Sequence, residues 1–526
     1  MEFRSTDGTG NNLANPGYNA TGTAFLRLAP AHFADGVSAP EAGPNPRTVS
    51  NLVSGEGEAA APNEQGLSGM MYAWGQFVDH DLSRTPLDRA NRMDIAVPAG
   101  DAHFPDGTVI PVGRAITDPA GGGNAVNAVT GWLDASMVYG SDAATAAALR
   151  LPDGRMAASE GGNLPVLDGG VLAGDVRAGE NPSLTALQVL FLREHNRQVE
   201  RLHAADPSLD AEALYQQARA IVGAQIAHIT YDEFLPHLLG PGAIAPYAGY
   251  DPGVDPRIGQ DFAGAAYRWG HSTVSAETRR LDETGEVDGP ELELRDAFFL
   301  DPALFADHGG AGGFLRHLAS DLSQAMDGRL VEDLRNFLFD PPVGQDLAAI
   351  NVQRGRDLGL PKLNEMREAL GLEPYTGIGQ ITDDPGIVAG LRAAYGTVDA
   401  VELWAGGLSE GLAPGAFVGE TFAAILAEQF TALRDGDRLW WQNAGFDRAT
   451  LAEIGGTTLS DIIRRNTDTK QLQEDVFVFH ERHPAEAEPE HPEWPQLVTG
   501  GGGAAREAPT AETEAAVQAG EAPWFL

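Results

Sequence analysis

The chain has 526 residues, a formal net charge of −40 at pH 7 and no cysteine. This charge argues against nucleic acid or an anionic membrane surface as a partner, because phosphates would be repelled. The lack of cysteine excludes disulfides, thiolate ligands and cysteine nucleophiles, and it leaves the redox compartment open. No run of about 20 apolar residues occurs, so we expect no membrane span, and no signal-peptide pattern is visible at the N-terminus.

The first third of the chain predicts one long helix among irregular segments. Residues 1–60 are rich in Gly, Asn, Pro and Ala and indicate an irregular arm wrapped on the body. An opening helix is expected over 64–82. A loop-rich segment follows over 83–130, in which 108–112 favour a small β-ribbon. Ser141 is the expected N-cap of a short helix over 141–150.

The remainder is dominated by helical patterns. Asn181-Pro182 begins a helix to about His203, with asparagine as N-cap and proline at the first helical position. Another helix is expected over 211–239, and further patterns cover 303–324, 329–338, 361–371, 386–396, 419–434 and 448–465. Strand-like alternation is nearly absent. The sequence therefore predicts a mainly α fold, a single large helical domain over 1–484 with long loops and minimal β structure. Residues 485–526 form an acidic Ala/Gly/Pro-rich tail that we expect to be mobile.

The most informative segment is WGQFVDHD at 74–81. On a helix, successive side chains lie about 100° apart, so Asp79, His80 and Asp81 point in three directions. Gln76 shares the face of His80. Two carboxylates beside a histidine in an apolar helix require partners, such as a metal, a covalent bond or a hydrogen-bond network. The alternative is a solvated helix end with an incidental histidine.

Later segments could supply such partners. The loop TGWLDAS at 130–136 brings together hard oxygen ligands that, with one carboxylate from Asp81, suit Ca²⁺: Thr130, the Trp132 carbonyl, Asp134 and Ser136. An ordinary polar turn is the alternative for this loop. In AGDVRAGENP at 173–182, Arg177 and Glu180 could equally form a simple ion pair.

Two more segments carry candidate residues. His271 lies in YRWGHS at 267–272 and could be a core histidine satisfied by one hydrogen bond. The segment AINVQRGRD at 349–357 could be a polar, arginine-rich loop facing solvent. Each of these segments is weak evidence when taken alone.

Taken together and in order, these motifs resemble the animal-type haem peroxidases of the peroxidase–cyclooxygenase superfamily, over roughly residues 5–480. The resemblance rests on WGQFVDHD, LDASMVYGS, AGDVRAGENPSLTALQVLFLREHNR, YRWGHS and INVQRGRDLGLP. It implies a haem b derivative and Ca²⁺ as cofactors. It also implies that H₂O₂ is reduced and that a halide, a pseudohalide or a small aromatic donor is oxidised through an iron–oxo intermediate. A secreted or periplasmic location is implied as well, and the oligomeric state stays open.

The resemblance implies a role for each matching residue. His271 would be the proximal iron ligand, with Asn351 at its other ring nitrogen. His80 would be the distal general acid–base. Arg177 would stabilise the charge that develops as the O–O bond breaks, and Gln76 would order the distal water.

Further matches concern attachment of the cofactors. Asp79 and Glu180 match two carboxylates that become ester-linked to haem methyl groups in this family. Arg268 and Arg354 are candidates for pairing with haem propionates. Asn181 stands where some members carry a methionine that forms a third, sulfonium link. We therefore expect two ester links, and easier oxidation of bromide, iodide or thiocyanate than of chloride. The five oxygen donors named above would bind Ca²⁺: Asp81, Thr130, Trp132, Asp134 and Ser136.

Two other functions are weighed. A cyclooxygenase-like fatty-acid dioxygenase needs a tyrosine three residues before the proximal histidine, where this chain has Arg268; Tyr267 is one residue too early. Such dioxygenases also lack the carboxylate found here at Asp79. A non-catalytic Ca²⁺-binding adhesion module would retain the scaffold without turnover.

Overall fold

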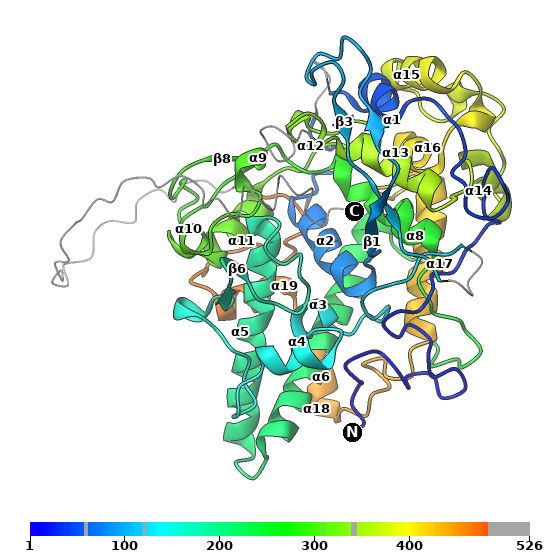
Figure 1. The fold of residues 1–526 in the computed structure, drawn as a ribbon. Helices are drawn as coiled ribbons and strands as arrows, with labels where there is room; N and C mark the ends of the chain where they lie inside the picture. The colour runs from blue at the N-terminus through cyan, green and yellow to red at the C-terminus, as the bar shows by residue number, and fades with distance from the viewer. Residues whose placement is uncertain (57–60, 119–122, 309, 338–344, 482–526) are drawn as a thin grey trace.

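The computed structural model describes residues 1–56, 61–118, 123–308, 310–337 and 345–481. The tail expected over 485–526 lies outside these residues. Helices dominate the described chain and the sheets are small, which confirms the predicted fold class. Figure 1 shows α2 (Met70–Leu82) near the middle of the molecule, with the long helices α5 (Pro182–Ala205) and α6 (Ala211–Ile229) side by side.

The other helical elements of the first half are α1 (Pro46–Val49), η1 (Ser50–Ser54), α3 (Ser136–Tyr139), α4 (Ala143–Leu149), η2 (Glu160–Gly162), η3 (Thr230–Phe234), α7 (Leu235–Leu239), α8 (Gln260–Gly264) and η4 (Ala266–Ser272). Those of the second half are α9 (Leu294–Ala297), α10 (Pro302–Ala306), α11 (Ala311–Ser320), α12 (Glu332–Arg335), α13 (Leu347–Asp357), α14 (Leu363–Ala369), η5 (Ile378–Gln380), α15 (Pro385–Tyr395), η6 (Val398–Ala400), α16 (Leu403–Ser409), α17 (Glu420–Asp435), α18 (Arg448–Ile454) and α19 (Leu459–Asn466).

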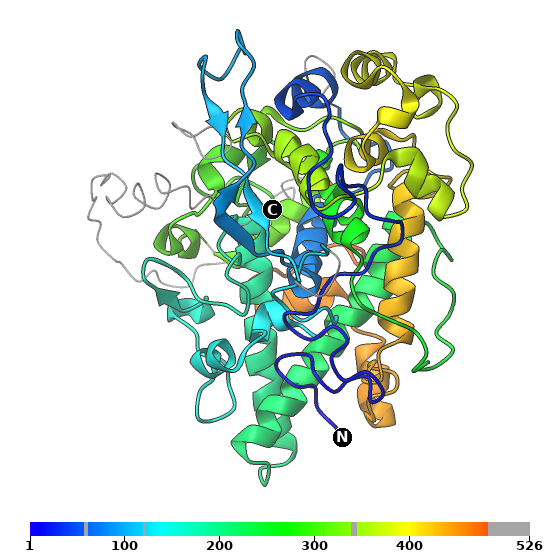
Figure 2. The same ribbon diagram turned by 45° about the vertical axis from the view of Figure 1, so that its right-hand side comes forward.

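The strands form two-stranded antiparallel ribbons: β1 (Leu87–Arg92) with β4 (Gly113–Ala115), β2 (Ile95–Ala96) with β3 (Val109–Ile110), β5 (Val166–Leu167) with β6 (Gly170–Val171), and β7 (Glu277–Thr278) with β8 (Leu292–Glu293). The β-ribbon expected at 108–112 is therefore present, since β3 pairs with β2. The N-terminal arm runs over the surface of the body (Figure 2), and the structure adds two short helical turns to it within 46–54.

Several predicted helix boundaries are wrong for local reasons. The opening helix begins at Met70 rather than near 64. The N-cap of α4 is Asp142, not Ser141, because the Asp142 carboxylate accepts the N–H groups of Ala144 and Thr145. The pattern over 448–465 divides at Gly455-Gly456 into α18 and α19, since glycine is a poor helix former. The sequence analysis did not predict α13 or α16.

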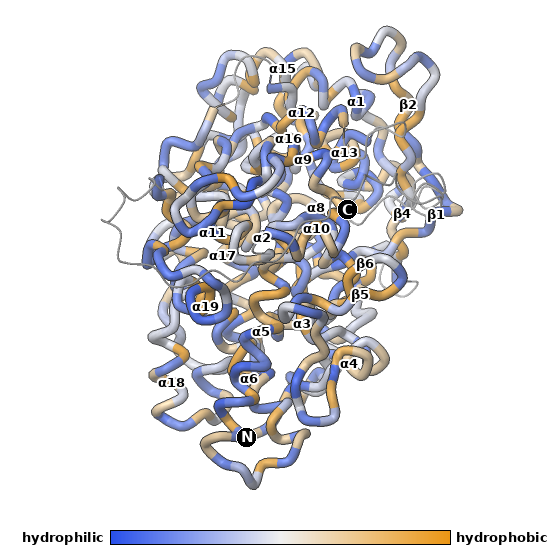
Figure 3. The backbone as a smooth tube through the Cα atoms, turned by 90° about the vertical axis from the view of Figure 1, so that its left-hand side faces the viewer, coloured by the Kyte–Doolittle hydropathy of each residue, from blue (hydrophilic) through white to orange (hydrophobic). Residues whose placement is uncertain are grey.

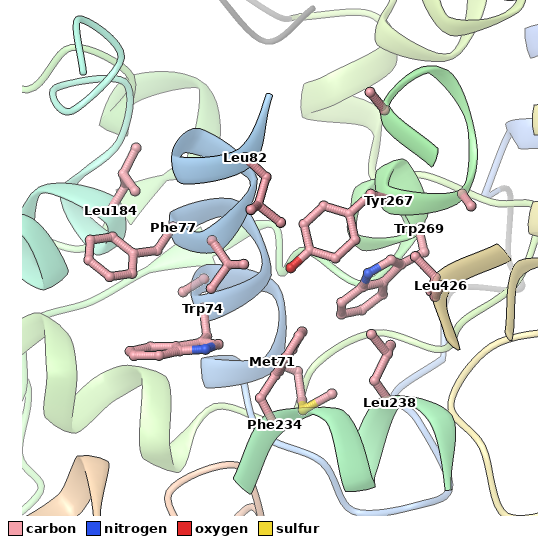
Figure 4. Close-up of a cluster of buried hydrophobic side chains, with 14 of the residues drawn as sticks. Met71, Trp74, Phe77, Leu82, Leu184, Phe234, Leu238, Tyr267, Trp269 and Leu426 are labelled. Carbon is pink, nitrogen blue, oxygen red and sulfur yellow. The ribbon is translucent and has the colours of Figure 1, made fainter. Parts of the chain in front are cut away.

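Aromatic packing around α2 forms the centre of the core (Figure 4). Trp74 and Phe77 are fully buried, and Phe77 stacks on Phe191 of α5 with ring centroids 5.3 Å apart. On the facing side, a Cβ added to Gly75 would lie 3.1 Å from Trp269 of η4. Glycine at this position therefore lets α2 and η4 approach closely, which brings the two histidine-bearing elements together.

A buried carboxylate links the middle of α5 to α19. Glu194 is fully buried and receives two hydrogen bonds from Arg465, at 2.6 and 2.9 Å, and one from Asn466 at 2.7 Å. Charge-assisted, bidentate bonds of this kind offset the cost of burying the charge. Hydrophilic and hydrophobic stretches are interspersed along the backbone (Figure 3), and no helix in the described ranges is both long and apolar enough to cross a membrane.

Candidate active site

A cavity lies between α2, η4 and the loop that leads into α5. Apolar and polar side chains from distant parts of the sequence line it. They include Tyr72, Gln76, Asp79, His80, Ser83, Arg84, Thr85, Arg177, Glu180, Asn181, Tyr267, Arg268, Trp269, His271, Leu294, Phe298 and Leu334. Polar groups that converge on a hollow with apolar and aromatic walls are typical of a small-molecule or cofactor site.

On α2, Gln76 and His80 face this cavity together, as their four-residue spacing predicts. Gln76 donates to Glu180 Oε2 at 3.1 Å and accepts from Asn181 Nδ2 at 2.9 Å. The His80 ring is only 3% exposed, and its closest carboxylate oxygens, on Asp175 and Glu180, are each 3.9 Å away. Burial, assisted by the charge of Arg177, lowers the pKa of His80 well below its usual value. At neutral pH this imidazole is therefore uncharged and able to accept a proton.

The Arg177 guanidinium is held in a fixed position. Its Nε donates to Asp175 Oδ1 at 2.8 Å, and its Nη2 donates to Asp175 Oδ2 at 3.0 Å and to the Ser83 carbonyl at 2.9 Å. Burial alone would raise the pKa of Asp175, but Arg177 lowers it to about 2, so the two form a charged pair. The sequence analysis did not single out Asp175. The Asp-x-Arg spacing in Gly174-Asp175-Val176-Arg177 was the available signal.

Gly174 allows the loop that carries this pair to contact α3 through the backbone. An added Cβ would lie 2.4 Å from the Ser136 carbonyl oxygen and 2.6 Å from the Tyr139 nitrogen, and neither backbone atom can move aside easily. We expect Gly174→Ala to lower the free energy of unfolding by about 1–3 kcal/mol through overpacking. Denaturant titration measures this effect. Gly170→Ala is the matched control because its added Cβ would have no neighbour closer than 3.9 Å; equal losses in both variants would contradict the assignment.

Asp79 and Glu180 both line the cavity. Asp79 Oδ1 accepts from Ser83 Oγ at 2.9 Å, and Asp79 Oδ2 lies 3.8 Å from Arg177 Nη1. Glu180 is 1% exposed, and among the described residues its Oε1 has no hydrogen-bond donor. Burial raises the pKa of Asp79, and raises that of Glu180 well above its ordinary value. The cavity therefore favours uncharged forms of both carboxyl groups.

The short 3₁₀-helix η4 carries His271 and Arg268 on the facing wall. Asn351 Nδ2 lies 2.9 Å from His271 Nδ1, and Asn351 Oδ1 accepts from Arg268 Nη1 at 2.6 Å. Burial, and then the Arg268 charge, lowers the pKa of His271 to about 3. The ring is thus neutral, and the Asn351 side chain contacts its Nδ1. A neutral, oriented imidazole is the form that ligates metals.

Asp79, Glu180, Arg268 and His271 line the cavity, but two other residues assigned to the cofactor do not: Asn351, which contacts His271, and Arg354. It lies three residues after Asn351 on α13, a helix where the alternative prediction was a solvent-facing loop. Its Nη1 donates to the Gly113 carbonyl at 2.9 Å and to Asp357 at 2.6 Å. Its Nε and Nη2 are buried without a hydrogen-bond partner among the described residues. They are therefore the atoms of Arg354 that could still bind an anionic group.

The oxygen-rich loop and Asp81 come together on the side of α2 away from the cavity. Asp81 is fully buried; its carboxylate accepts from Ser136 Oγ at 2.9 Å and from the backbone N–H of Asp134 at 3.0 Å. Thr130 Oγ1 donates to Asp134 Oδ1 at 2.9 Å, while the Trp132 carbonyl accepts from the Asp134 N–H at 3.0 Å. The structure thus brings all five predicted oxygen donors together.

Among the described residues, no arginine, lysine or histidine side chain forms an ion pair with the carboxylates of Asp81, on α2, and Asp134, in the loop. Burial, and then Asp134, raises the pKa of Asp81 to about 8, and burial raises the pKa of Asp134 as well. Asp134 Oδ2 is buried without a hydrogen-bond donor among the described residues. No group of three or more acidic or histidine side chains in the described ranges could hold a metal, so a cation here would depend on neutral oxygens. The donor set fits Ca²⁺, a hard cation that carbonyls and hydroxyls ligate readily.

Tyr267 also lines the cavity, although it lies four residues before His271. Its ring stacks on Phe262 with centroids 4.6 Å apart. Its hydroxyl is buried and has no hydrogen-bond partner in the described part of the chain. The position three residues before His271, where a cyclooxygenase-like dioxygenase needs a tyrosine, is occupied by Arg268, as the sequence analysis noted.

Comparisons with known proteins identify the family and the fold. The chain is 33% identical to the peroxidasin homolog pxn-2 of Caenorhabditis elegans, over 91% of this chain and 42% of that protein. It is 33% identical to thyroid peroxidase of Sus scrofa, over 90% of this chain and 60% of that protein. The structure matches peroxidase A from Dictyostelium discoideum with a TM-score of 0.83 and 31% identity, covering 91% of this chain and 100% of that one. Fatty acid alpha-dioxygenase of Arabidopsis thaliana, at a TM-score of 0.78 and 23% identity, shares the fold alone.

The mainly helical fold, with a cavity that two histidines line, has the architecture shared by these peroxidases and dioxygenases. The family model described as animal haem peroxidase matches residues 3–477, and the chain belongs to that family. Haem is the cofactor that the family implies. The cavity fits it, since it offers a neutral, oriented imidazole and aromatic side chains. The chain spans about half the length of the first two relatives named above.

Proposed function

We propose that this protein is a haem peroxidase that reduces H₂O₂ and oxidises small anionic or aromatic donors. The observation that carries the proposal is the pair of neutral histidines, His80 and His271, on one cavity, with the fixed Arg177 guanidinium near His80. His271 would ligate the iron and Asn351 would orient the ring. Bound haem supplies the redox chemistry that no side chain here can provide.

The residues around His80 suit proton transfer to and from a peroxide. As a neutral, buried base, His80 can take the proton from one peroxide oxygen and return it to the other. Arg177, fixed by Asp175, keeps its positive charge aimed at the site where negative charge develops. Gln76 adds an oriented amide on the same helix face. These groups bind, orient and move protons, whatever the identity of the reductant.

The reductant class follows from the resemblance and from Asn181. Asn181 donates to Gln76 and caps α5, so it has a structural role and no sulfur with which to form a third link to haem. We therefore propose bromide, iodide, thiocyanate or small phenols as donors, in preference to chloride. A secreted or periplasmic location remains part of this proposal, as does the lack of a nucleic-acid partner on a chain with a net charge of −40.

The test is a turnover assay on hemin-reconstituted protein. H₂O₂ with iodide should give sustained oxidation, while O₂ uptake with linoleate should stay at background. Oxygen uptake without peroxidation would favour the fatty-acid dioxygenase alternative. A haem spectrum without turnover of any donor would favour the non-catalytic adhesion module.

We propose that Asp79 and Glu180 form ester links with haem, because the cavity disfavours their charged forms and an ester carries no charge. After incubation with H₂O₂, acid–organic extraction should leave haem on the wild-type protein. Mass spectrometry should find it on the peptides of both residues. We expect Glu180→Gln combined with Asp79→Asn to release the haem completely. Glu160→Gln, at an exposed position on η2, should retain it as the control. Full release from wild type would remove the ester proposal and leave the peroxidase proposal standing.

We propose that Ca²⁺ binds Asp81, Thr130, Asp134, Ser136 and the Trp132 carbonyl. A ligand that binds only the folded state stabilises it, by about 2.7 kcal/mol at 100 times its dissociation constant. The thermal unfolding midpoint of wild type should therefore fall on chelation and recover with added Ca²⁺. Asp134→Asn should remove most of this Ca²⁺ response, whereas Asp142→Asn, which keeps the α4 N-cap nearby, should preserve it. A midpoint that is insensitive to Ca²⁺ in wild type would contradict the site.

A further inference from the structure

One tyrosine on the cavity wall has no role in the proposed function. Tyr72 lies on α2, four residues before Gln76 and seven before Asp79, so these three side chains share one face of the helix, and all of them line the cavity. A Cβ added to Gly270, the residue before His271, would lie 3.9 Å from the Tyr72 Cβ. Tyr72 therefore lies beside the segment that carries the proposed iron ligand.

The phenol of Tyr72 has a carboxylate as its hydrogen-bond partner. Its hydroxyl donates to Asp321 Oδ2 at 3.2 Å, and Ser275 Oγ donates to the same oxygen at 2.6 Å. Asp321 is the C-cap of α11, and its backbone carbonyl accepts the N–H of Gly69, the N-cap of α2, at 2.8 Å. Burial, and then the negative charge of Asp321, raises the pKa of Tyr72 well above its usual value. In the resting protein the phenol therefore keeps its proton and directs it at a base.

The other oxidisable side chains on the described cavity wall lack such a base. The Tyr267 hydroxyl and the Trp269 Nε1 are both buried, and neither has a hydrogen-bond partner among the described residues. Removal of an electron without the proton would leave a positive charge in a buried site, which is costly. Tyr72 is therefore the side chain on this wall from which an electron and a proton can leave together.

We propose that Tyr72 is a redox-active residue that is oxidised to a tyrosyl radical, with Asp321 as its proton acceptor, and so stores one oxidising equivalent of the peroxide away from the haem. This inference rests on the proposed peroxidase function and names a second site of oxidation for it. H₂O₂ takes up two electrons and two protons as it forms two water molecules. One electron comes from the bound haem and the other from Tyr72, while both protons come from solvent.

The phenol proton moves to Asp321 as the electron leaves, which produces a neutral radical beside a neutral carboxyl group. A one-electron donor such as a small phenol then returns the electron to Tyr72, and Asp321 returns the proton. Ser275 keeps the Asp321 carboxylate in position through the 2.6 Å hydrogen bond, so the acceptor oxygen stays within reach of the phenol in each cycle.

The test compares wild type with Tyr72→Phe, Asp321→Asn and Tyr267→Phe. Tyr267→Phe is the matched control, because it removes another buried phenol from the same cavity. Each hemin-loaded protein is mixed with H₂O₂ without a donor, frozen at set times and measured by electron paramagnetic resonance. A nitroso spin trap followed by mass spectrometry locates the radical. In a second arm, zinc protoporphyrin replaces hemin and is oxidised by light with persulfate as the electron acceptor, so that neither iron nor H₂O₂ is needed.

Wild type and Tyr267→Phe should give the same tyrosyl signal in both arms, with the trap on the peptide that contains Tyr72, and Tyr72→Phe should lose the signal. Asp321→Asn keeps a hydrogen-bond acceptor but no base, so we expect radical formation to slow by about 10²- to 10⁴-fold, the usual contribution of a positioned general base. The visible band of the loaded protein should persist in every variant, as evidence of an intact cavity.

A trap on any other peptide of wild type would overturn the proposal, and this result needs no variant to fold. An undiminished signal in Tyr72→Phe, its loss in Tyr267→Phe, or wild-type kinetics in Asp321→Asn would overturn it as well. If H₂O₂ changes neither the haem band nor the resonance spectrum of wild type, the peroxidase proposal fails, while the zinc protoporphyrin arm still decides the role of Tyr72.

Discussion

His271→Ala is expected to abolish the visible absorption band that hemin gives with the wild-type protein, measured before any peroxide is added. His271 is the histidine of η4 and lines the cavity, and the Asn351 contact at 2.9 Å orients its neutral imidazole. Without it, haem would be held by the cavity walls alone. We expect an affinity loss of at least about 100-fold, since even loss of a group that merely orients a ligand costs 10–100-fold.

Two controls separate ligation from folding in this experiment. Far-UV circular dichroism should show an intact helical fold in His271→Ala, and added imidazole should restore part of the band by filling the space that the side chain leaves. His308→Ala removes an imidazole that is 46% exposed and should leave the band unchanged. An unaltered band in His271→Ala would refute the assignment of the proximal ligand.

His80→Gln is expected to slow the reaction with H₂O₂ by about 10²- to 10⁴-fold, the usual contribution of a general acid–base. Glutamine keeps a polar group of similar reach but cannot carry the proton between the two peroxide oxygens. The visible band of the resting holoprotein should persist, because His80 does not hold the cofactor in this proposal. Stopped-flow mixing with H₂O₂ measures the rate.

The Arg177–Asp175 pair provides an independent comparison for that rate. Arg177→Lys keeps the charge but loses the fork that binds Asp175 through two nitrogens, so a smaller loss than in His80→Gln is expected. A wild-type rate in His80→Gln would mean that proton transfer runs through another group, such as ordered water. Both variants should still show the haem band.

Short-range sequence patterns were enough to predict which side chains of α2 share a face. The four-residue spacing of Gln76 and His80 puts both on one face of a helix, and the same periodicity sends Asp81 to the other side. Helix periodicity is a local property, so these directions follow from the chain itself. The N-cap Asn181 is another local feature, and its side chain accepts the N–H of Leu184 as predicted.

The partners of the site residues were harder to predict from the sequence. Asp175 is buried and fixes Arg177, yet the Asp-x-Arg spacing is a weak signal because many loops share it. Arg354 was placed at the cofactor by resemblance. It lies on α13, where Gly113 and Asp357 hold one of its nitrogens away from the cavity wall. Only the packing of α13 against its neighbours decides where that guanidinium points.

The amino-acid sequence by itself determined the helical class, which residues of α2 share a face and the order of the motifs, because these depend on residues within a few positions of one another. The tertiary structure alone decided that His80 and His271 line one cavity and that burial raises the pKa values of Asp79 and Glu180. These properties depend on burial and on the distance between charges that lie far apart along the chain. Such quantities exist only once the chain has folded.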